Sequence, residues 1–275
     1  VVTGATLVTV PALIDRCVAW VGVDSPEAAY KLLQLMQQGA GPQLEGFELM
    51  PQSAVNAVVR HIAGTRWPTE SQHDWNVLIE LVQDQPSQRV PAELASALLQ
   101  RAMELGLADD AVLASNEAQA ESFWKIRDSI SEAERAEGPA MQHDISVPVS
   151  EMARFVASES PAMERAFPGT KVVAFGHLGD GNIHYHVKAP PGADPALWYE
   201  HEGPVISASV YDRVAAYGGS LSAEHGIGQS KISELSRLGD TARLNAQRAI
   251  KAALDPQGIM NPGKLVPLAS DSSDH

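Results

Sequence analysis

Apolar residues along the chain fall into two alternating patterns. Short runs of consecutive or alternating apolar residues are typical of strands, whereas apolar residues that recur every three or four positions are typical of helices. The first pattern predicts strands at 17–23, 44–50, 75–82, 112–114, 144–149, 171–175 and 183–187. The second pattern predicts helices at 26–38, 53–62, 91–105, 117–137, 150–159, 195–217 and 240–254.

Two of the predicted helices begin with a recognisable signal. Ser25 precedes Pro26, and a hydroxyl N-cap followed by proline at the first helical position is a common helix start. Ser150 is expected to cap the helix at 150–159 in the same way. Strands that alternate with helices of these lengths predict an α+β fold, in which a largely antiparallel sheet with ferredoxin-like elements is covered by helices and followed by C-terminal helices.

The chain shows no internal linker, so we expect one compact domain over residues 12–267. Residues 1–11 alternate like a strand and begin without a Met or a basic leader, so we interpret them as the end of a different domain. The tail at 268–275 is rich in Ser and Asp and is expected to be disordered.

Composition and charge exclude several classes of function. The formal net charge is -14 at pH 7 and no Lys/Arg cluster stands out, which argues against a nucleic-acid partner. No apolar run reaches the roughly 18–20 residues of a membrane span, so no transmembrane segment is expected. Cys17 is the only cysteine and lies in an apolar run, so we expect it to be buried. Because no intrachain disulfide can form, a cytoplasmic location is predicted.

The segment from His177 to His186 combines three histidines with a glycine-rich turn. The turn residues 179–182, Gly-Asp-Gly-Asn, tolerate the positive φ of a tight hairpin. His177 and His184 bracket this turn almost symmetrically, so their imidazoles are expected to converge from opposite arms. His184 and His186 are two apart on one strand and project from the same face. This spacing favours a metal site over three unrelated surface histidines.

A second glycine-rich segment, 218–228, carries Glu224 and His225. On its own, the sequence Glu-His-Gly is more typical of a solvated loop than of a site. Together with the hairpin histidines, however, Glu224 completes a set of two imidazoles and one carboxylate. Such a set commonly binds Zn²⁺, Mn²⁺ or Fe²⁺ and leaves coordination positions open.

Three motifs, in this order, resemble one enzyme family. They are His177-Leu-Gly-Asp-Gly-Asn-Ile-His184, Glu224-His-Gly-Ile-Gly228 and Asn261-Pro-Gly-Lys-Leu265. Over essentially its whole length the chain is similar to the C-terminal domain of the FAD-linked oxidases, which include D-lactate, D-2-hydroxyglutarate and glycolate dehydrogenases. The resemblance implies FAD, bound mainly by an N-terminal flavin domain that this sequence lacks. Residues 1–11 resemble the last strand of that domain.

The resemblance also implies roles for individual residues. His177, His184 and Glu224 match the family's divalent-metal ligands, with zinc as the expected ion and manganese or iron as alternatives. His225 matches the residue beside the substrate hydroxyl and is the expected general base. Arg127 matches the arginine that binds the substrate carboxylate, and a planar guanidinium suits a planar carboxylate.

Three further positions bear on the substrate. Ser131, one turn after Arg127, supplies a hydroxyl where the family contacts substrate. Gln142 stands where 2-hydroxyglutarate dehydrogenases carry a lysine, and His186 stands where they often carry an asparagine. Because a neutral amide does not balance a second carboxylate, Gln142 predicts a monocarboxylate substrate such as D-lactate or glycolate. Lys231 is the alternative cation for a second carboxylate.

The expected reaction is oxidation of a D-2-hydroxyacid to the 2-oxoacid with FAD as hydride acceptor. Asn261 and Lys264 match an edge contact with the flavin, so the chain without its flavin domain is expected to be inactive. An electron-acceptor protein or a quinone is the expected partner of the reduced flavin, and a homodimer is compatible with the resemblance. Two alternatives stay open: a metal-dependent hydrolase and a non-catalytic, metal-stabilised binding module.

Overall fold

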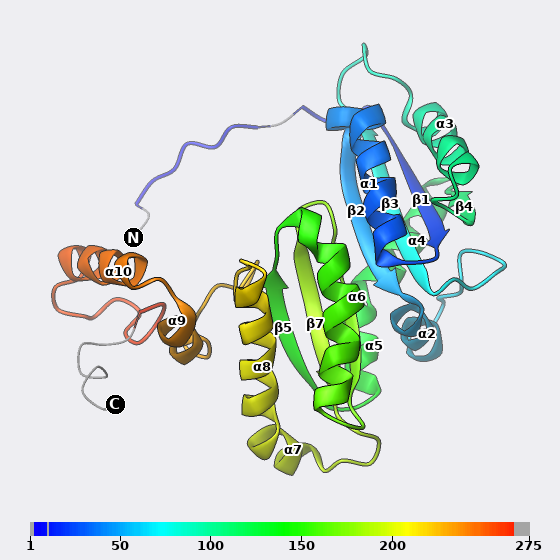
Figure 1. Ribbon diagram of the computed structural model, residues 1–275. Helices are drawn as coiled ribbons and strands as arrows, with labels where there is room; N and C mark the ends of the chain where they lie inside the picture. The colour runs from blue at the N-terminus through cyan, green and yellow to red at the C-terminus, as the bar shows by residue number, and fades with distance from the viewer. Residues whose placement is uncertain (1–2, 10, 267–275) are drawn as a thin grey trace. The chain divides into compact units, whose positions relative to one another are not determined.

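The computed structural model describes residues 3–9 and 11–266 (Figure 1), so the tail expected at 268–275 lies outside the described residues. The chain divides into two compact units, Val1–Ala133 and Glu134–His275. Each unit contains an antiparallel sheet with helices packed on it, so the expected α+β class is confirmed. That the two units together form one family domain over residues 12–267 remains a proposal.

The segment ahead of the first sheet does not form the expected strand in the part of the chain that the structure describes. Residues 3–9 are exposed and have neither helical nor strand structure. A strand needs a neighbour to accept and donate its backbone hydrogen bonds. The interpretation of 1–11 as a strand of another domain therefore remains a prediction about a longer protein.

The first unit has the strand order β4-β1-β3-β2, and all neighbouring strands are antiparallel. Its strands are β1 (Asp15–Val23), β2 (Leu44–Pro51), β3 (Trp75–Gln83) and β4 (Asp110–Leu113). Its helices are α1 (Pro26–Ala40), the short 3-10 helix η1 (Gly41–Gln43), α2 (Gln52–His61), α3 (Pro91–Glu104), α4 (Glu117–Asp128) and the start of α5 (Ile130–Ala136). The succession β1-α1-β2-β3-α3-β4, with α2 inserted before β3, is the ferredoxin-like arrangement that the sequence predicted.

Strand β1 is buried on both faces, because every residue from Cys17 to Val23 is buried. A strand covered on one face only would alternate between buried and exposed residues. Helices α1 and α3 contact this sheet, and α4 packs on it through Phe123, whose ring centroid lies 6.1 Å from that of Trp20. Cys17 is buried, as expected, and burial raises the pKa of its thiol to about 11.

The second unit has the strand order β6-β7-β5, again antiparallel throughout. Its strands are β5 (Ala140–Ser146), β6 (Lys171–His177) and β7 (Asn182–Lys188). Its helices, after the end of α5, are α6 (Val149–Ala166), α7 (Pro195–His201), α8 (Gly203–Ala216), α9 (Ile232–Leu238) and α10 (Thr241–Leu254). Among the described residues of either unit, no helix is long and apolar enough to cross a membrane.

Helices α6 and α8 cover one face of the second sheet (Figure 1). Phe155 of α6 packs edge-on against Tyr185, with ring centroids 5.6 Å apart, and Tyr211 of α8 packs against His143 at 5.4 Å. Residues His143 and Tyr185 are direct cross-strand partners and therefore share this face. Since side chains alternate along a strand, the neighbours of His143 and Tyr185 on β5 and β7 project from the opposite face.

Several helix boundaries differ from the predicted ones, and a proline explains one of them. The helix predicted at 195–217 is divided between α7 and α8, because Pro204 has no N–H to continue the hydrogen bonds of α7. Conversely, α6 continues to Ala166 past Pro161, where the sequence predicted an end. It begins after Pro148 without a side-chain cap, so the capping role predicted for Ser150 is wrong. The helix predicted at 117–137 is interrupted at Ser129, and no proline or glycine marks that position.

Candidate metal and substrate site

The predicted hairpin is confirmed: β6 ends at His177, four residues turn, and β7 begins at Asn182. Gly181 has a positive φ of 81°, and its carbonyl accepts a hydrogen bond from the Val147 N–H at 3.0 Å. A Cβ at Gly181 would lie only 2.1 Å from the Val147 carbonyl oxygen. Glycine is therefore required here both by conformation and by the close approach of the neighbouring chain.

The two hairpin histidines are diagonal neighbours rather than direct partners. His184 lies opposite Phe175, so His177 is two residues nearer the turn on the other strand. His177 is therefore offset by two residues from the position directly opposite His184, and the symmetric placement predicted from the sequence is wrong. Both side chains still project from the same face, and their ring centroids are 6.3 Å apart.

Glu224 joins these two histidines and completes a three-residue cluster. Its Oε1 lies 3.2 Å from the His177 Nε2, and one donor atom from each of His177, His184 and Glu224 lies within 4.8 Å of the others. Ligand atoms at about 2.1 Å from a tetrahedral ion are about 3.4 Å apart. The distance of 3.2 Å between Glu224 and His177 is close to that spacing, and two imidazoles with one carboxylate are the kind of donor set that suits a divalent ion such as zinc.

His225 stands next to this cluster with a side chain that is 69% exposed. Its Nδ1 lies 3.7 Å from the Oδ2 of Asp144, a buried carboxylate on β5. Burial alone would raise the pKa of Asp144, but hydrogen bonds from the backbone N–H groups of His225 and Glu224, together with the nearby charges of His225 and Lys231, lower it. Asp144 is therefore ionised at neutral pH. Nothing in the sequence marks Asp144 as a site residue except its place in an extended segment two residues after Gln142.

The β5–β7 register places Gln142 directly opposite His186, on the face that carries His184. Gln142 is exposed, whereas His186 is only 3% exposed. Burial, followed by the charges of His184 and other neighbours, lowers the pKa of His186 to about 3. This pair therefore presents two neutral side chains on the face of the sheet that carries His184, the candidate metal-binding face. Gln142 and His186, two of the residues predicted to contact substrate, therefore lie on one face with His184.

Arg127 and Ser131 belong to the first unit, on α4 and α5 respectively. The Arg127 Nε donates to the Glu48 Oε2 at 2.9 Å, and the Glu48 side chain, on β2, is only 2% exposed. Arg127 is thus a half-buried, ion-paired residue rather than a solvated helix charge. Glu48 is a partner that sequence reasoning missed, because nothing in the pattern marks it as a neighbour of α4.

Asn261 and Lys264 lie in the exposed loop after α10. The Lys264 N–H donates to the Asn261 carbonyl oxygen at 3.3 Å. The buried Asp255 organises the preceding turn, accepting from the N–H groups of Ile259 at 3.0 Å and Met260 at 2.9 Å. Asn261 and Lys264 of the Asn-Pro-Gly-Lys motif are therefore exposed to solvent, which the predicted edge contact with a flavin would require.

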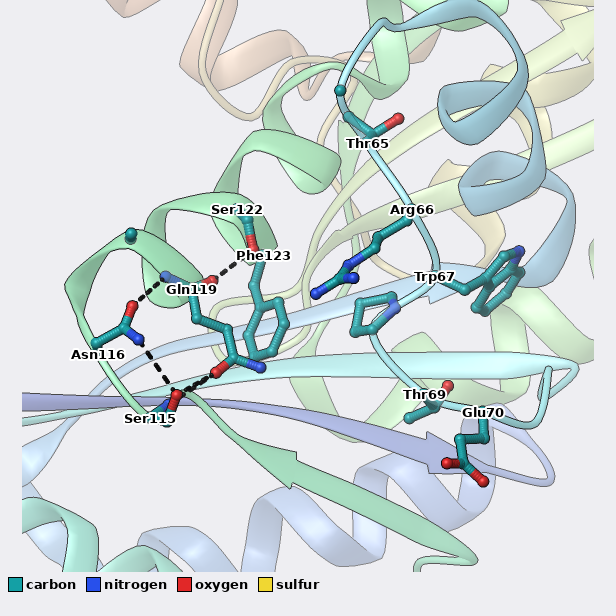
Figure 2. A pocket seen from close by; sticks show the side chains of 13 residues that line it. Thr65, Arg66, Trp67, Thr69, Glu70, Ser115, Asn116, Gln119, Ser122 and Phe123 are labelled. Atoms are coloured by element: carbon teal, nitrogen blue, oxygen red, sulfur yellow. Dashed lines mark hydrogen bonds between the residues drawn. The ribbon is translucent and has the colours of Figure 1, made fainter.

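The first unit also has a pocket of about 940 Å³ between α4 and the loop at 64–70 (Figure 2). Arg66 extends from this loop toward α4, whose start contributes Asn116 and Gln119. The polar groups at the helix start bond to one another, for example Gln119 N–H to the Asn116 Oδ1 at 3.0 Å. Of the described residues that line this pocket, none is a site residue predicted from the sequence.

Comparison with known proteins identifies the family of this chain. The sequence profile of the FAD linked oxidases, C-terminal domain, matches residues 14–265. The mitochondrial D-2-hydroxyglutarate dehydrogenase of Arabidopsis thaliana is 34% identical over 97% of this chain, which covers 46% of that protein. The D-2-hydroxyglutarate dehydrogenase of Xanthomonas citri pv. viticola is 34% identical over 81% of the chain, covering 46% of that protein. The chain thus spans about half the length of these relatives.

Solved structures extend the likeness to the fold. A p-cresol methylhydroxylase with substrate bound has a TM-score of 0.64 at 10% identity, covering 92% of this chain and 53% of that one. The 4-ethylphenol oxidase from Gulosibacter chungangensis has a TM-score of 0.61 at 16% identity, covering 94% of this chain and 55% of that one. At these identities the likeness shows a shared fold and nothing about the substrate.

Proposed function

The chain belongs to the C-terminal domain family of FAD-linked oxidases, and from this premise we propose that it forms the substrate- and metal-binding part of an FAD-dependent D-2-hydroxyacid dehydrogenase. The observation that carries the proposal is the cluster of His177, His184 and Glu224, with donor atoms within 4.8 Å of one another beside His225. The named relatives act, by their names, on D-2-hydroxyglutarate.

The chain's own residues bind and orient the acid and accept its proton. When bound, FAD supplies the two-electron oxidation and a divalent metal, zinc with manganese or iron as alternatives, supplies positive charge beside the α-hydroxyl. His225 accepts the hydroxyl proton, for which its exposed imidazole beside the cluster is suited. Arg127 binds the carboxylate through charge-assisted hydrogen bonds, and Ser131 adds a hydroxyl one turn further on.

The neutral pair Gln142 and His186 supports a monocarboxylate substrate, such as D-lactate or glycolate. Lys231, the alternative cation, donates to three oxygens of its own unit: the Asp144 carbonyl at 3.3 Å, the Leu221 carbonyl at 2.9 Å and the Ser222 Oγ at 3.0 Å. An ammonium has three N–H donors, so these contacts account for all of them. Lys231 therefore acts within the loop rather than as a counter-charge for a second carboxylate.

The test is anaerobic mixing of the flavin-containing protein with D-lactate, D-2-hydroxyglutarate and their L-enantiomers. Bleaching of the oxidised-flavin absorbance by a D-acid, and not by its L-enantiomer, is the expected result. Absence of bleaching with every D-2-hydroxyacid, or equal rates with both enantiomers, would overturn the proposal. A chelator-treated sample should bleach slowly and recover when Zn²⁺ or Mn²⁺ is restored.

The same preparation separates the two alternative functions. A metal-dependent hydrolase would cleave esters or phosphoesters without flavin, and a binding module would gain stability from metal but bind no 2-hydroxyacid. The partners beyond the substrate, namely an electron-acceptor protein or a quinone, a flavin domain and a second copy in a homodimer, are part of the proposal. So is a cytoplasmic location, although the named Arabidopsis relative is described as mitochondrial.

A further inference from the structure

The geometry points to Asp144 as the positioning residue of this site: we infer that one oxygen of its carboxylate holds the metal ligand Glu224 and the base His225 in their working places. The inference rests on the proposed function, because it concerns the same site. It adds a residue that lies outside the three-residue cluster of His177, His184 and Glu224.

Asp144 lies at the right place in the sheet for this role. It is directly opposite His184 in the β5–β7 register, so the two side chains share the metal-binding face. Its side chain is only 3% exposed. The Oδ2 accepts hydrogen bonds from the backbone N–H groups of Glu224 at 2.9 Å and His225 at 2.8 Å. Two consecutive N–H groups directed at one oxygen fix the orientation of that peptide segment, and a charged acceptor strengthens both bonds.

The loop that carries these residues has few other attachments. Residues 221–231 contain neither helix nor strand, and an isolated bridge between Ser146 and Ser220 ties the loop's start to the end of β5. The side chains of Glu224 and His225 are exposed, so they gain little from packing. Holding such a residue in a single conformation costs conformational entropy. The hydrogen bonds to Asp144 offset that cost at the two residues where geometry matters.

Lys231 and Ser222 make further hydrogen bonds between Asp144 and the same loop. The Lys231 ammonium joins the Asp144 carbonyl to the Leu221 carbonyl and the Ser222 Oγ. The Ser222 Oγ in turn lies 3.4 Å from the Asp144 Oδ2 and donates to the Gly226 carbonyl at 2.8 Å. Asp144 thus contacts the loop through both its side chain and its backbone, and every contact lies within the second unit.

Hydrogen exchange measured by NMR on the full chain tests the positioning directly. In Asp144→Ala, the amides of Glu224 and His225 should exchange at least about tenfold faster than in wild type, because an acceptor worth about 1.5–3 kcal/mol is lost. Amides in β6 and β7 should be unchanged. Asp144→Asn keeps an acceptor oxygen without the charge and should give an intermediate rate. It also serves if the alanine variant fails to fold.

Asp180→Asn is the matched control. This exposed carboxylate accepts one backbone N–H, that of Asn182, in the adjacent turn. Its substitution should leave exchange at Glu224 and His225 unchanged. Unchanged exchange at these two amides in Asp144→Asn and in any folded Asp144→Ala chain would overturn the inference.

Metal affinity, measured by Zn²⁺ competition with a chromophoric chelator, gives a readout that general stability would not move. Asp144→Ala should weaken Zn²⁺ binding by about 10-fold to 100-fold, and Asp144→Asn by less. In a Glu224→Ala background, Asp144→Asn should have little further effect, because the ligand it positions is already gone. Full additivity would refute positioning through Glu224.

Zn²⁺ binding by the wild-type chain separates the proposed metal site from the role of Asp144. Wild-type chain that binds no Zn²⁺ would refute the metal site of the proposed function, and the exchange rates would still decide on Asp144. Wild-type chain that binds Zn²⁺ with the same affinity as Asp144→Ala would refute this inference alone.

Discussion

His177 and His184 supply the two imidazoles of the candidate metal site, and each can be tested singly. Replacing either with alanine removes one of three protein ligands, so metal content by elemental analysis should fall to background. His201→Ala is a suitable control, because this exposed histidine lies in the same unit, on α7. Equal metal content in wild type and in a variant with both His177→Ala and His184→Ala would show that the ion binds elsewhere.

Arg127 should determine how tightly the acid binds. A bidentate arginine–carboxylate contact is worth about 1.5–3 kcal/mol, so Arg127→Lys in the flavin-containing protein should raise KM by roughly 10-fold to 100-fold. Lysine keeps a positive charge beside the buried Glu48 and so limits the loss of stability that alanine would cause. An unchanged KM in a folded Arg127→Lys protein would place the carboxylate elsewhere.

Gln142 should determine which acid is preferred. Gln142→Lys adds a charge on the metal-binding face and should improve kcat/KM for D-2-hydroxyglutarate by about tenfold relative to D-lactate, the equivalent of roughly 1.4 kcal/mol. His186, directly opposite position 142, is buried and uncharged, so a lysine at position 142 would supply the positive charge that His186 does not. A wild-type protein that already prefers the dicarboxylate by a wide margin would contradict the argument.

At the scale of elements, the hairpin depends on one of its two turn glycines far more than on the other. Gly181→Ala introduces a Cβ 2.1 Å from the Val147 carbonyl oxygen at a positive φ, whereas nothing lies within 4 Å of a Cβ at Gly179. We therefore expect Gly181→Ala to lower the melting temperature and Zn²⁺ affinity, and Gly179→Ala to change both little. Similar losses in the two variants, measured by thermal melting and chelator competition, would contradict this account of the turn.

Elements with a regular apolar pattern could be predicted from the sequence. A helix without an apolar face, and a break within a helix, could not. The helices α1, α2, α3 and α10 and all the strands but β5 fall within three residues of their predicted limits, whereas β5 begins four residues before its predicted start. Helix α9 was missed because none of its described residues is buried, so it has no apolar stripe to signal it. The break at Ser129 has no sequence signal, because serine is compatible with a continuous helix.

At the scale of the whole molecule, pH should act on stability through His143. This residue is buried between β7 and α8, with its Nδ1 3.0 Å from the Tyr185 carbonyl and its Nε2 3.0 Å from the Ser207 Oγ. Burial lowers its pKa to about 4; the Tyr185 carbonyl opposes that shift and the charge of Lys231 adds to it. Tyr211 packs edge-on against the ring. The imidazole is therefore neutral in the folded chain at neutral pH.

The sign of the effect follows from proton binding. Unfolded His143 takes up a proton near pH 6.5, whereas the folded residue does so only near its lowered pKa, so the unfolding free energy falls as pH falls through this window. The loss attributable to His143 is about 3 kcal/mol between pH 7 and pH 4. Denaturant unfolding of wild type and His143→Gln across that range should show a flatter pH dependence in the variant. Parallel curves would show that His143 does not contribute.

The sequence by itself determined the fold class, the hairpin and the identity of the metal-ligand candidates, because periodicity and short motifs are local properties. It also indicated the family, since three short motifs in a fixed order can be recognised without knowing how the chain packs. Only the tertiary structure decided the diagonal placement of His177, the pairing of Arg127 with Glu48 and the contacts of Asp144. Residues 144 and 224 are far apart along the chain, and a hydrogen bond between them depends on where β5 and the loop after α8 come together. Long-range contacts of this kind arise from packing, and a single sequence contains no periodic signal for them.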